Sequence, residues 1–511
     1  MHLDLLGNPS SGGNCYLLTE DEDTLMLDAG LAWSPNRALG VDFTVPRLVD
    51  EQRAFLHTIV ITHPHEDHIG ALPYVLAQLD RTVRIIAGPV TAAIITQRLA
   101  ETRETAIVEA VPPYGWGETS RFRFQLVPVP HSASESMAMY IKAGSRTMLY
   151  SGDLRGTDET GYGRLPSKFL TEHSRVDVLL LEAVRADVED ADPTLADLKE
   201  GLLAALNRLQ GRRIIVSAFA SNLTRLQIII ELAHSLGRCS YLLGRSMKNA
   251  AETAQQFQRM PKQAWEVGPP PKDADDSKVL ILVAGAQGEP DAGLSRLIRG
   301  HYPVQARKGD GLIMSSTPIP GNEEAFWTLV EMAMKKGVEV ITYRDYLVHI
   351  SGHSTASELQ RIMRLVQPRW VIPFHGDYYR HAIMRELGRA VGVPPRRFIP
   401  ASNGDRVHLG QTPVVAHCDW PVDHYQLGRG RQRHPVKLDP EVLEQRRRML
   451  DAGTIVVRTD RRSPAVTCVD CGTEVEDFVT ANAPRSRRDI GSFKKLISRS
   501  FATPPMVLEV A

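Results

Sequence analysis

A cluster of histidines that directly follows an apolar stretch constrains this sequence more than any other feature. Leu56–Thr62 is mostly apolar and β-branched, which is typical of a buried strand. The next six residues, His63–His68, contain three histidines and one aspartate. A turn at a strand end lets several side chains converge, and zinc at catalytic sites takes imidazole and carboxylate ligands. The cluster therefore predicts a metal site rather than a solvated loop.

Further residues of ligand type stand just past predicted strands, each beside a glycine or another small residue. They are His131, Asp153 and His375. Together with His63, His65, Asp67 and His68 they make seven nitrogen and oxygen ligands. Such a set is enough for two ions that share one carboxylate, as two-metal hydrolytic sites require. The set contains no cysteine, which argues against a structural zinc site.

The composition fits a large folded protein with more than one domain. The chain has 511 residues, of which 43% are hydrophobic and 23% charged. Because single cores stop growing near about 250–300 residues, we expect roughly three domains. Short strands and glycine-rich turns dominate the start, with polar residues where strands end, which is typical of an α/β or sandwich layout. From about Leu195 strands and helices alternate, which predicts a second domain with a parallel sheet.

The charge and cysteine content limit the compartment and the partners. No stretch reaches the roughly 18 apolar residues of a membrane span, and Met1–Gly7 lacks the features of a signal peptide. Five cysteines in the chain do not make a disulfide framework, so we expect a cytoplasmic protein without a membrane partner. The net charge is zero, but the stretch from Arg429 to Ala511 has 16 Lys and Arg against 11 Asp and Glu. A solvated tail and a nucleic-acid-binding tail both fit that local excess.

These motifs resemble those of a known fold. His63–His68 resembles the H-x-H-x-D-H signature of the metallo-β-lactamase fold, whose other motifs are matched in order and spacing by Asp28, His131 and Asp153. The stretch after Leu181 resembles the β-CASP insertion of nucleases that have this fold. The acidic and histidine motifs of that group are matched by Glu182, His353 and His375.

Four further strings are similar to those of one β-CASP family, ribonuclease J. They are Phe219–Asn222, Gly244–Met247, Gly285–Pro290 and Pro318–Glu323. The resemblance implies an α/β protein: a metallo-β-lactamase αββα sandwich with an inserted β-CASP α/β domain and a small C-terminal region. The domain bounds that we predict are 1–185 and 341–415 for the sandwich, 186–340 for the insertion, 416–440 for a linker and 441–511 for a C-terminal domain.

The resemblance also implies the roles of the individual residues. The first of two zinc ions would be held by His63, His65, His131 and Asp153, and the second by Asp67, His68, Asp153 and His375. Asp28 and Glu182 would orient ligand imidazoles. Catalytic roles fall to Asp67, Glu182 and His353, of which His353 would face the scissile phosphate or the leaving oxygen.

A pocket for the terminal phosphate of an RNA needs hydroxyls, exposed backbone N–H groups and an arginine. The residues that we expect to bind substrate are His349, Ile350, Ser351, Gly352, His353, Ser354, Thr355, Ser315, Ser316, Ser221, Asn222 and Arg225. Thr317 and Arg245 belong to the same stretches. For Ser221, Asn222 and Arg225, capping of a helix start is an equally good interpretation.

The resemblance predicts a zinc-dependent ribonuclease that degrades single-stranded RNA from a 5′-monophosphorylated end and also cuts internally. Two alternatives stay open: a DNA-processing nuclease of the same fold, and a catalytically silent RNA-binding partner of an active paralogue. The histidine at position 375 favours RNA, because the DNA-repair branch tends to have an apolar residue there. We expect a homodimer or homotetramer. The lone pair Cys468 and Cys471 is compatible with free thiols or with an added zinc site.

Overall fold

The protein is described here from a computed structural model. The structure describes residues 1–8, 12–34, 39–156, 163–189, 193–260, 264–289, 292–319, 322–427, 434–452, 454–458, 465–469 and 506–510. The chain divides into two compact units, Met1–Leu31 with Pro46–Pro421 and Ala32–Val45 with Val422–Ala511. Among the described residues, no helix has the length and apolar character needed to cross a membrane. Pro290, Pro320, Gly321 and Cys471 of the sequence motifs lie outside the described residues.

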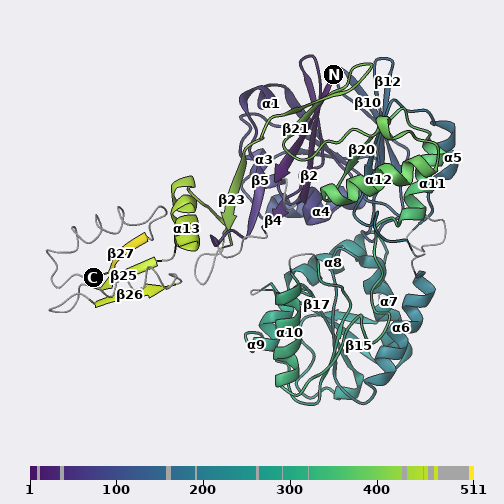
Figure 1. Cartoon of the computed structure of the whole chain (residues 1–511). Coiled ribbons are helices and arrows are strands. Elements are labelled where there is room, and N and C mark those ends of the chain that lie inside the picture. Colours follow the sequence, from purple (N-terminus) through teal and green to yellow (C-terminus); the bar gives the residue numbers. More distant parts are fainter. Residues whose placement is uncertain are drawn as a thin grey trace. The chain divides into compact units, whose positions relative to one another are not determined.

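Two β-sheets pack face to face in the first unit (Figure 1). The larger has the order β22-β21-β1-β2-β3-β6-β7-β8 and the smaller the order β20-β13-β12-β11-β10-β9. The strands of the larger sheet are β1 (His2–Asn8), β2 (Gly12–Glu20), β3 (Asp23–Leu27), β6 (Leu56–Ile61), β7 (Arg84–Ala87), β8 (Ile107–Ala110), β21 (Asp405–His408) and β22 (Val414–His417). Those of the smaller are β9 (Trp116–Glu118), β10 (Phe122–Pro128), β11 (Met137–Ala143), β12 (Arg146–Tyr150), β13 (Val178–Glu182) and β20 (Trp370–Phe374).

Apolar side chains from both sheets fill the space between them, and helices cover the outer faces. Leu27 of the larger sheet and Phe124 of the smaller one are fully buried in this core. The helices are α1 (Asp50–Phe55), α2 (Glu66–Ile69), α3 (Leu72–Leu76), α4 (Pro89–Ala100), α5 (Ser167–Glu172), α11 (Ala356–Val366) and α12 (Tyr378–Ala390). The last three pack on the outer face of the smaller sheet through a second apolar cluster. The predicted αββα sandwich is confirmed.

A parallel α/β domain is inserted between β13 and β20. Its sheet has the order β16-β15-β17-β14-β18-β19, and every neighbouring pair is parallel. The strands are β14 (Ile214–Ser217), β15 (Cys239–Leu243), β16 (Trp265–Val267), β17 (Val279–Val283), β18 (Gly311–Met314) and β19 (Glu339–Ile341). The helices are α6 (Leu195–Arg208), α7 (Leu223–Ser235), α8 (Arg245–Gln256), α9 (Gly293–Arg299) and α10 (Glu323–Lys335).

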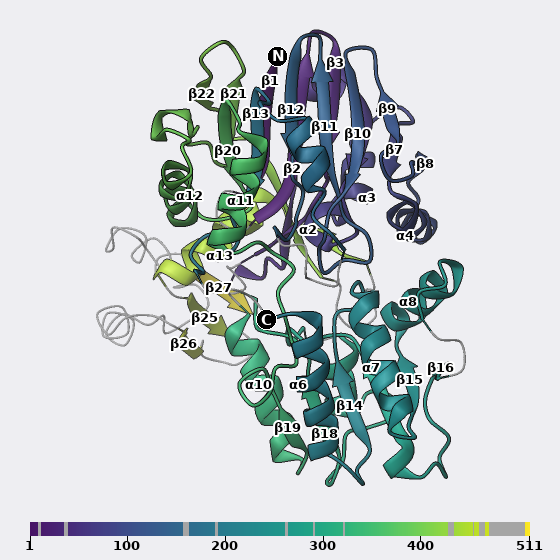
Figure 2. The same cartoon turned by 90° about the vertical axis from the view of Figure 1, so that its right-hand side faces the viewer.

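Both faces of the inserted sheet are covered, which explains why its central strands are apolar throughout. The first three helices share one apolar cluster with one face of the sheet, and the last two share another with the opposite face. Figure 1 shows the strands between these two helical layers, and Figure 2 shows the same domain from the side of α6 and α7. All five residues of β17 are buried. The predicted second domain with a parallel sheet is confirmed.

Strand direction brings the sequence motifs to one edge of the sandwich. In the larger sheet β3, β6 and β7 are parallel, and in the smaller sheet β12, β13 and β20 are parallel. Parallel strands end at the same edge of a sheet. Residues just past these strands are Asp28, His63, Asp153 and His375, and Glu182 is the last residue of β13. The inserted domain leaves the sandwich at this edge, directly after β13.

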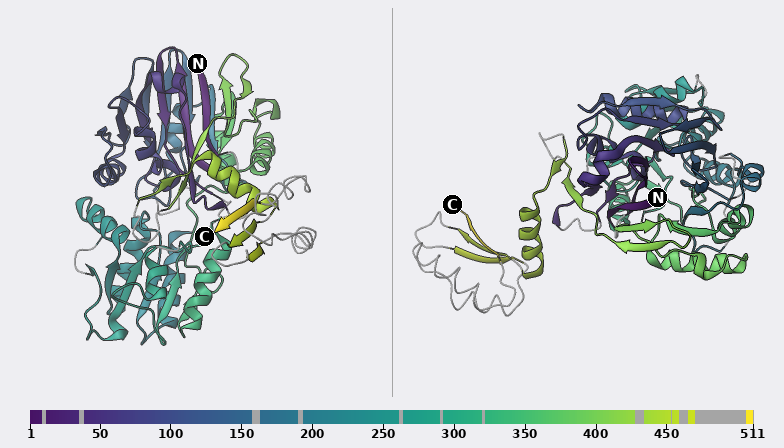
Figure 3. Two further views of the ribbon diagram at one scale, coloured as in Figure 1. Left: turned by 90° about the vertical axis from the view of Figure 1, so that its left-hand side faces the viewer. Right: turned by 90° about the horizontal axis from the view of Figure 1, so that it is seen from above.

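The second unit combines an early segment of the chain with its C-terminal part. A four-stranded sheet has the order β24-β23-β5-β4, and a three-stranded sheet has the order β26-β25-β27. The elements are β4 (Ala32–Trp33), β5 (Phe43–Pro46), β23 (Val422–Gln426), β24 (Val436–Lys437), α13 (Pro440–Ala452), β25 (Thr454–Arg458), β26 (Ala465–Val469) and β27 (Met506–Val510). Figure 3 shows α13 and the three-stranded sheet. Two of these strands, β23 and β24, fall in the range 416–440, and the domain bounds themselves stay predictions.

Candidate metal centre

Two groups of histidine and aspartate side chains meet at the shared edge of the sandwich. The first group is His63, His65, His131 and Asp153, and the second is Asp67, His68, Asp153 and His375. Within each group the ligand atoms lie within 4.8 Å of one another, so each group is able to hold a metal ion. The structure thus brings together all seven side chains selected from the sequence, and Asp153 belongs to both groups.

Backbone hydrogen bonds hold the histidine-rich turn against the end of β3. Ala29 N donates to His68 O at 2.8 Å, and Leu31 N donates to Glu66 O at 3.2 Å. Asp28 has a φ of 58°, a left-handed conformation that is uncommon for a residue other than glycine. This conformation turns the chain back at the strand end, so that the two turns lie against each other.

Asp28 lies behind the second group and orients one of its imidazoles. Its carboxylate is fully buried and accepts hydrogen bonds from His68 Nδ1 at 2.8 Å, Tyr150 OH at 2.7 Å and Thr62 N at 2.7 Å. With Nδ1 engaged, His68 directs Nε2 toward Asp153 Oδ2, 3.3 Å away. A carboxylate that holds the outer nitrogen of an imidazole fixes its tautomer and its orientation for a metal.

Three imidazole nitrogens converge in the first group. His65 Nδ1 lies 3.1 Å from His63 Nε2 and 3.2 Å from His131 Nε2. Burial lowers the pKa of His65 to about 4 and holds the pKa values of His63 and His131 well below the ordinary value. Near neutral pH these imidazoles are uncharged, and neutral imidazole is the form that binds metal. Their nitrogens converge closely enough to serve as ligands of one ion.

Asp153 supplies the strongest local indication of a cation. Both of its carboxylate oxygens are buried and neither accepts a hydrogen bond. Oδ2 lies 3.3 Å from His68 Nε2, 3.5 Å from His375 Nε2 and 3.6 Å from His63 Nε2. Burying a carboxylate without a hydrogen bond costs several kcal/mol. A divalent ion on each side of Asp153 would offset that cost, so the residues present fit two metal ions.

The second group is more open to solvent than the first, in which His65 alone is partly exposed. The side chains of Asp67 and His375 are 34% and 16% exposed, while that of His63 has no exposed surface. His375 has a φ of 50°, and its Nε2 lies 3.2 Å from Asp67 Oδ2. The ligand candidates that face solvent are therefore Asp67, His375 and His65.

His353 stands beside the cluster in contact with Glu182. Its Nδ1 lies 3.1 Å from Glu182 Oε2, and its side chain is 21% exposed. Burial lowers the pKa of His353, but the charges of Glu182 and Asp153 outweigh that effect and raise it above the ordinary value. The other oxygen of Glu182 accepts from Leu154 N and Ser354 N. The imidazole that Glu182 orients is thus that of His353.

The residues at the start of α7 that were expected to contact RNA take part in hydrogen bonds within the protein. Asn222 Oδ1 accepts from Arg225 N at 2.9 Å, which is a helix cap. The carbonyl of Ser221 accepts from Ser134 Oγ at 2.8 Å. Arg225 is 1% exposed. Helix capping is observed for Asn222, and contact of these residues with RNA stays a prediction.

Most of the other serines and threonines expected to bind substrate are buried. Ser315 Oγ donates to Val348 O at 2.6 Å, and Ser354 Oγ donates to Leu154 O at 2.8 Å. Residues with no exposed surface are Ser315, Ser316, Ser354 and Thr355. Parts of this segment remain at the surface, since Ser351 and His353 are partly exposed. By contrast, the side chain of Arg245 is 80% exposed.

Some residues of the centre were not selected from the sequence. Tyr150 and Thr62 both contact Asp28, and Asn14 Nδ2 lies 2.8 Å from His68 Nε2. Arg155 is 1% exposed and lies two residues past Asp153. A signal existed for Tyr150 and Thr62, because each is the last residue of a predicted strand that leads to a ligand.

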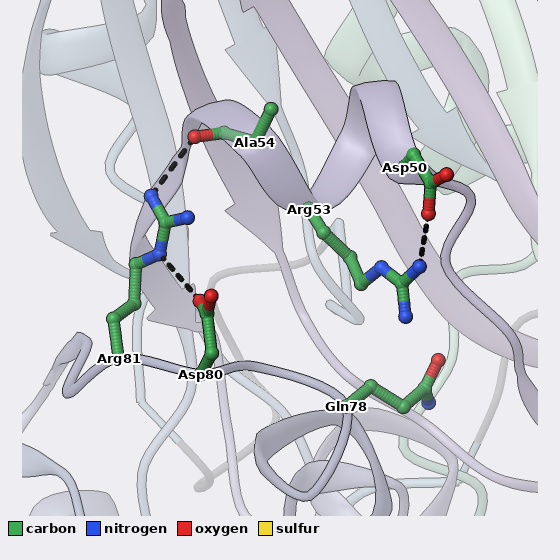
Figure 4. A pocket seen from close by; sticks show the side chains of 6 residues that line it. All are labelled: Asp50, Arg53, Ala54, Gln78, Asp80 and Arg81. Atoms are coloured by element: carbon green, nitrogen blue, oxygen red, sulfur yellow. Dashed lines mark hydrogen bonds and ion pairs between the residues drawn. The ribbon is translucent and has the colours of Figure 1, made fainter.

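A separate cavity lies on the outer side of the larger sheet. It has a volume of about 310 Å³ and is lined by Asp50, Arg53, Ala54, Gln78, Asp80 and Arg81. Figure 4 shows that its charged groups pair with one another: Arg53 with Asp50, and Arg81 with Asp80. It shares no residue with the metal centre.

The fold and the site define a class. A metallo-β-lactamase sandwich, an inserted parallel α/β domain and a paired histidine and aspartate cluster are the features of a metal-dependent hydrolase of the β-CASP group. Family models match the chain in three consecutive stretches. They are Metallo-beta-lactamase superfamily at residues 9–209, Ribonuclease J, beta-CASP domain at 211–333, and Zn-dependent metallo-hydrolase RNA specificity domain at 337–396.

Curated relatives agree with these matches. Ribonuclease J of Mycobacterium tuberculosis is 33% identical over 397 residues, which cover 75% of this chain and 70% of that protein. Ribonuclease J of Thermus thermophilus is 29% identical to this chain. The alignment covers 87% of this chain and 80% of that protein. The chain belongs to the ribonuclease J family, whose members are metal-dependent nucleases.

A solved structure supports the fold alone. The crystal structure of a protein of unknown function from Enterococcus faecalis has a TM-score of 0.53 and 16% sequence identity to this chain. The alignment covers 73% of this chain and 94% of that one.

Proposed function

We propose that this chain is a zinc-dependent ribonuclease that hydrolyses phosphodiester bonds of single-stranded RNA. It acts as a 5′–3′ exonuclease and as an endonuclease, in RNA maturation and decay. The observation that carries the proposal is Asp153, a buried carboxylate without a hydrogen bond that belongs to both ligand groups. The relatives named Ribonuclease J and the family model named for RNA specificity support RNA as the substrate.

Two zinc ions per chain are the cofactors that we propose. One is held by His63, His65, His131 and Asp153, and the other by Asp67, His68, Asp153 and His375. Zinc fits the donor set because imidazole nitrogens and carboxylate oxygens are its ligands at catalytic sites. When bound, the ions supply an ionised water near neutral pH and neutralise charge on the phosphate.

The protein's own groups supply orientation and proton transfer. Asp28 fixes His68 through Nδ1, so that the other ring nitrogen faces the shared carboxylate. Glu182 holds His353 through its Nδ1, and the partly exposed ring is placed to protonate the leaving 3′ oxygen or to stabilise the anionic transition state. Asp67 is the solvent-facing carboxylate of the centre.

The substrate contacts follow from the loops around the exposed side of the centre. We propose that the 5′-terminal phosphate of the RNA binds to the partly exposed positions within 349–355 and to the loop after β18. We also propose that Arg245 contacts the RNA. We also propose the domain bounds given above, a homodimer or homotetramer, and a cytoplasmic location.

The test is digestion of one RNA that carries a 5′-monophosphate, a 5′-triphosphate or a 5′-hydroxyl, with the matching DNA strand alongside. Products are sized over time and zinc is counted by elemental analysis. We expect mononucleotides chiefly from the monophosphorylated RNA, with about two zinc ions per chain. Equal digestion of DNA would replace the proposal by a DNA-processing nuclease. Bound zinc without any cleavage would replace it by a silent RNA-binding subunit.

A further inference from the structure

We propose that Arg225 of the inserted domain is a positioning residue for phosphodiester hydrolysis. Its guanidinium holds the Ile350–Gly352 segment and thereby fixes His353 beside the metal centre. This inference rests on the proposed function, because it assigns a role in that same reaction.

The segment from Ile350 to His353 is held by an unusual run of contacts. Successive backbone carbonyls each accept a hydrogen bond from the side chain of a residue distant in the sequence. The pairs are Arg225 Nη2 with Ile350 O (3.0 Å), Arg155 Nη1 with Ser351 O (3.4 Å), His131 Nδ1 with Gly352 O (2.8 Å) and Arg185 Nη1 with His353 O (3.5 Å). The contacts of Arg225 and His131 are the short ones, so these two residues fix the segment most firmly.

Arg225 connects this segment to the inserted domain. It lies in the first turn of α7, and its Nη1 donates to Ser315 O at 3.0 Å, directly after β18. The same nitrogen lies 2.8 Å from His349 Nδ1, which accepts from it. A guanidinium presents several donors in a rigid planar fork, which suits simultaneous binding of backbone groups on two elements. The side chain therefore sets the distance between the inserted sheet and the Ile350–Gly352 segment.

The other side of the segment presses against the metal centre. A side chain at Gly352 would place its Cβ 2.7 Å from His131 Nδ1, so only glycine permits this approach. Gly352 O in turn accepts from that nitrogen and leaves His131 Nε2 facing the first ligand group. His353 N donates to Ser351 Oγ at 3.2 Å, so the ring of His353 moves when the segment moves.

Loss of the guanidinium would release the segment without touching either ligand group. Arg225 belongs to neither group, so zinc content is expected to stay unchanged. A displacement of about 1 Å of a catalytic group can lower the rate by about 100-fold. We therefore expect Arg225→Met to lower kcat on 5′-monophosphorylated RNA by about 10- to 100-fold, with little change in KM.

A matched control lies just past the other end of the same helix. Arg238 is also buried and donates to two backbone carbonyls, Arg212 O at 2.8 Å and Val279 O at 3.2 Å. Arg238→Met removes the same number of bonds to carbonyls from the same domain, away from the segment. Urea unfolding should show comparable destabilisation in both variants, whereas only Arg225→Met should lower kcat. Arg225→Lys retains the charge and one donor group and should recover part of kcat.

The decisive measurement is a double-mutant cycle with His353→Ala, read out as kcat on the same RNA. If Arg225 acts through His353, Arg225→Met should cause little further loss in the His353→Ala background. Fully additive losses, loss of zinc in Arg225→Met, or an equal fall in kcat for Arg238→Met would overturn the positioning role. If the unmodified chain cleaves RNA and Arg225→Met cleaves it equally well, this inference fails while the proposed function stands. If the unmodified chain cleaves no RNA, the proposed function itself fails.

Discussion

The metal cluster and the polar loops of the inserted domain differ in how their polar atoms are used. At the cluster, both oxygens of Asp153 are buried without a hydrogen bond, and imidazole nitrogens face one another. In the loops, Ser315 and Asn222 are also buried, but each has a partner within the chain. Burying a carboxylate without a hydrogen bond costs far more than burying a hydroxyl, so the two oxygens of Asp153 point to a ligand. A buried polar group with a partner is explained by the fold itself.

The largest effect is expected for Asp153→Asn. The amide keeps the shape of the side chain but removes the charge shared by both groups, so cleavage should be abolished and less zinc retained. Digestion assays and elemental analysis test this. Cleavage at the rate of the unmodified chain, or an unchanged zinc content, would break the comparison.

His353→Ala should give the next largest effect. Removing a group that transfers a proton lowers the rate by about 100- to 10,000-fold. Both zinc ions should remain, since His353 belongs to neither ligand group. Single-turnover cleavage together with elemental analysis measures this. If the variant loses zinc, His353 is itself a metal ligand and the assignment of the two ligand groups is wrong.

Asp28→Asn tests how far metal binding depends on the hydrogen bond between Asp28 and His68. The substitution weakens the acceptor for His68 Nδ1 while keeping the size of the side chain. Loss of such a partner typically lowers metal affinity or activity about 10- to 100-fold. Competition with a zinc chelator should show weaker retention of zinc. Unchanged retention would mean that burial alone orients His68.

Ser315→Ala should give the smallest effect, and a different kind of effect. It removes one hydrogen bond to Val348 O and leaves that carbonyl without this donor. We expect the free energy of unfolding to fall by about 1 kcal/mol, with zinc content unchanged. Urea unfolding and elemental analysis check both parts. Loss of zinc would show that metal binding depends on the loop that contains Ser315.

The sequence predicts the cluster better than its surroundings, for a physical reason. The seven ligand candidates follow strands, and parallel strands end at one edge, so order along the chain already implies proximity. The contact between His131 and Gly352 joins residues 221 positions apart, and no local pattern marks a carbonyl group as a partner. Arg225 is equally ambiguous, because a helix start with a polar residue fits both capping and substrate binding.

The same limit applies to the fold. Apolar strands and alternating helices predict the sandwich and the inserted sheet, because the burial of a strand or of one helix face requires apolar residues at regular spacing. The membership of Ala32–Val45 in the second unit does not follow from any such period. Its strand β5 lies beside β23 in a sheet formed with the C-terminal part of the chain, and pairing over such separations is set by the completed fold.

The pairing of β1 with β21 has a consequence for synthesis of the protein. His2 lies opposite His408, and His375 of the second ligand group is encoded far downstream of Asp153. A ribosome adds about 5–20 residues per second. Tens of seconds therefore pass between the synthesis of β1 and that of β21, with which it pairs. Until then the nascent chain lacks a complete second ligand group. A nuclease built in this order stays inactive while most of its own message is being translated.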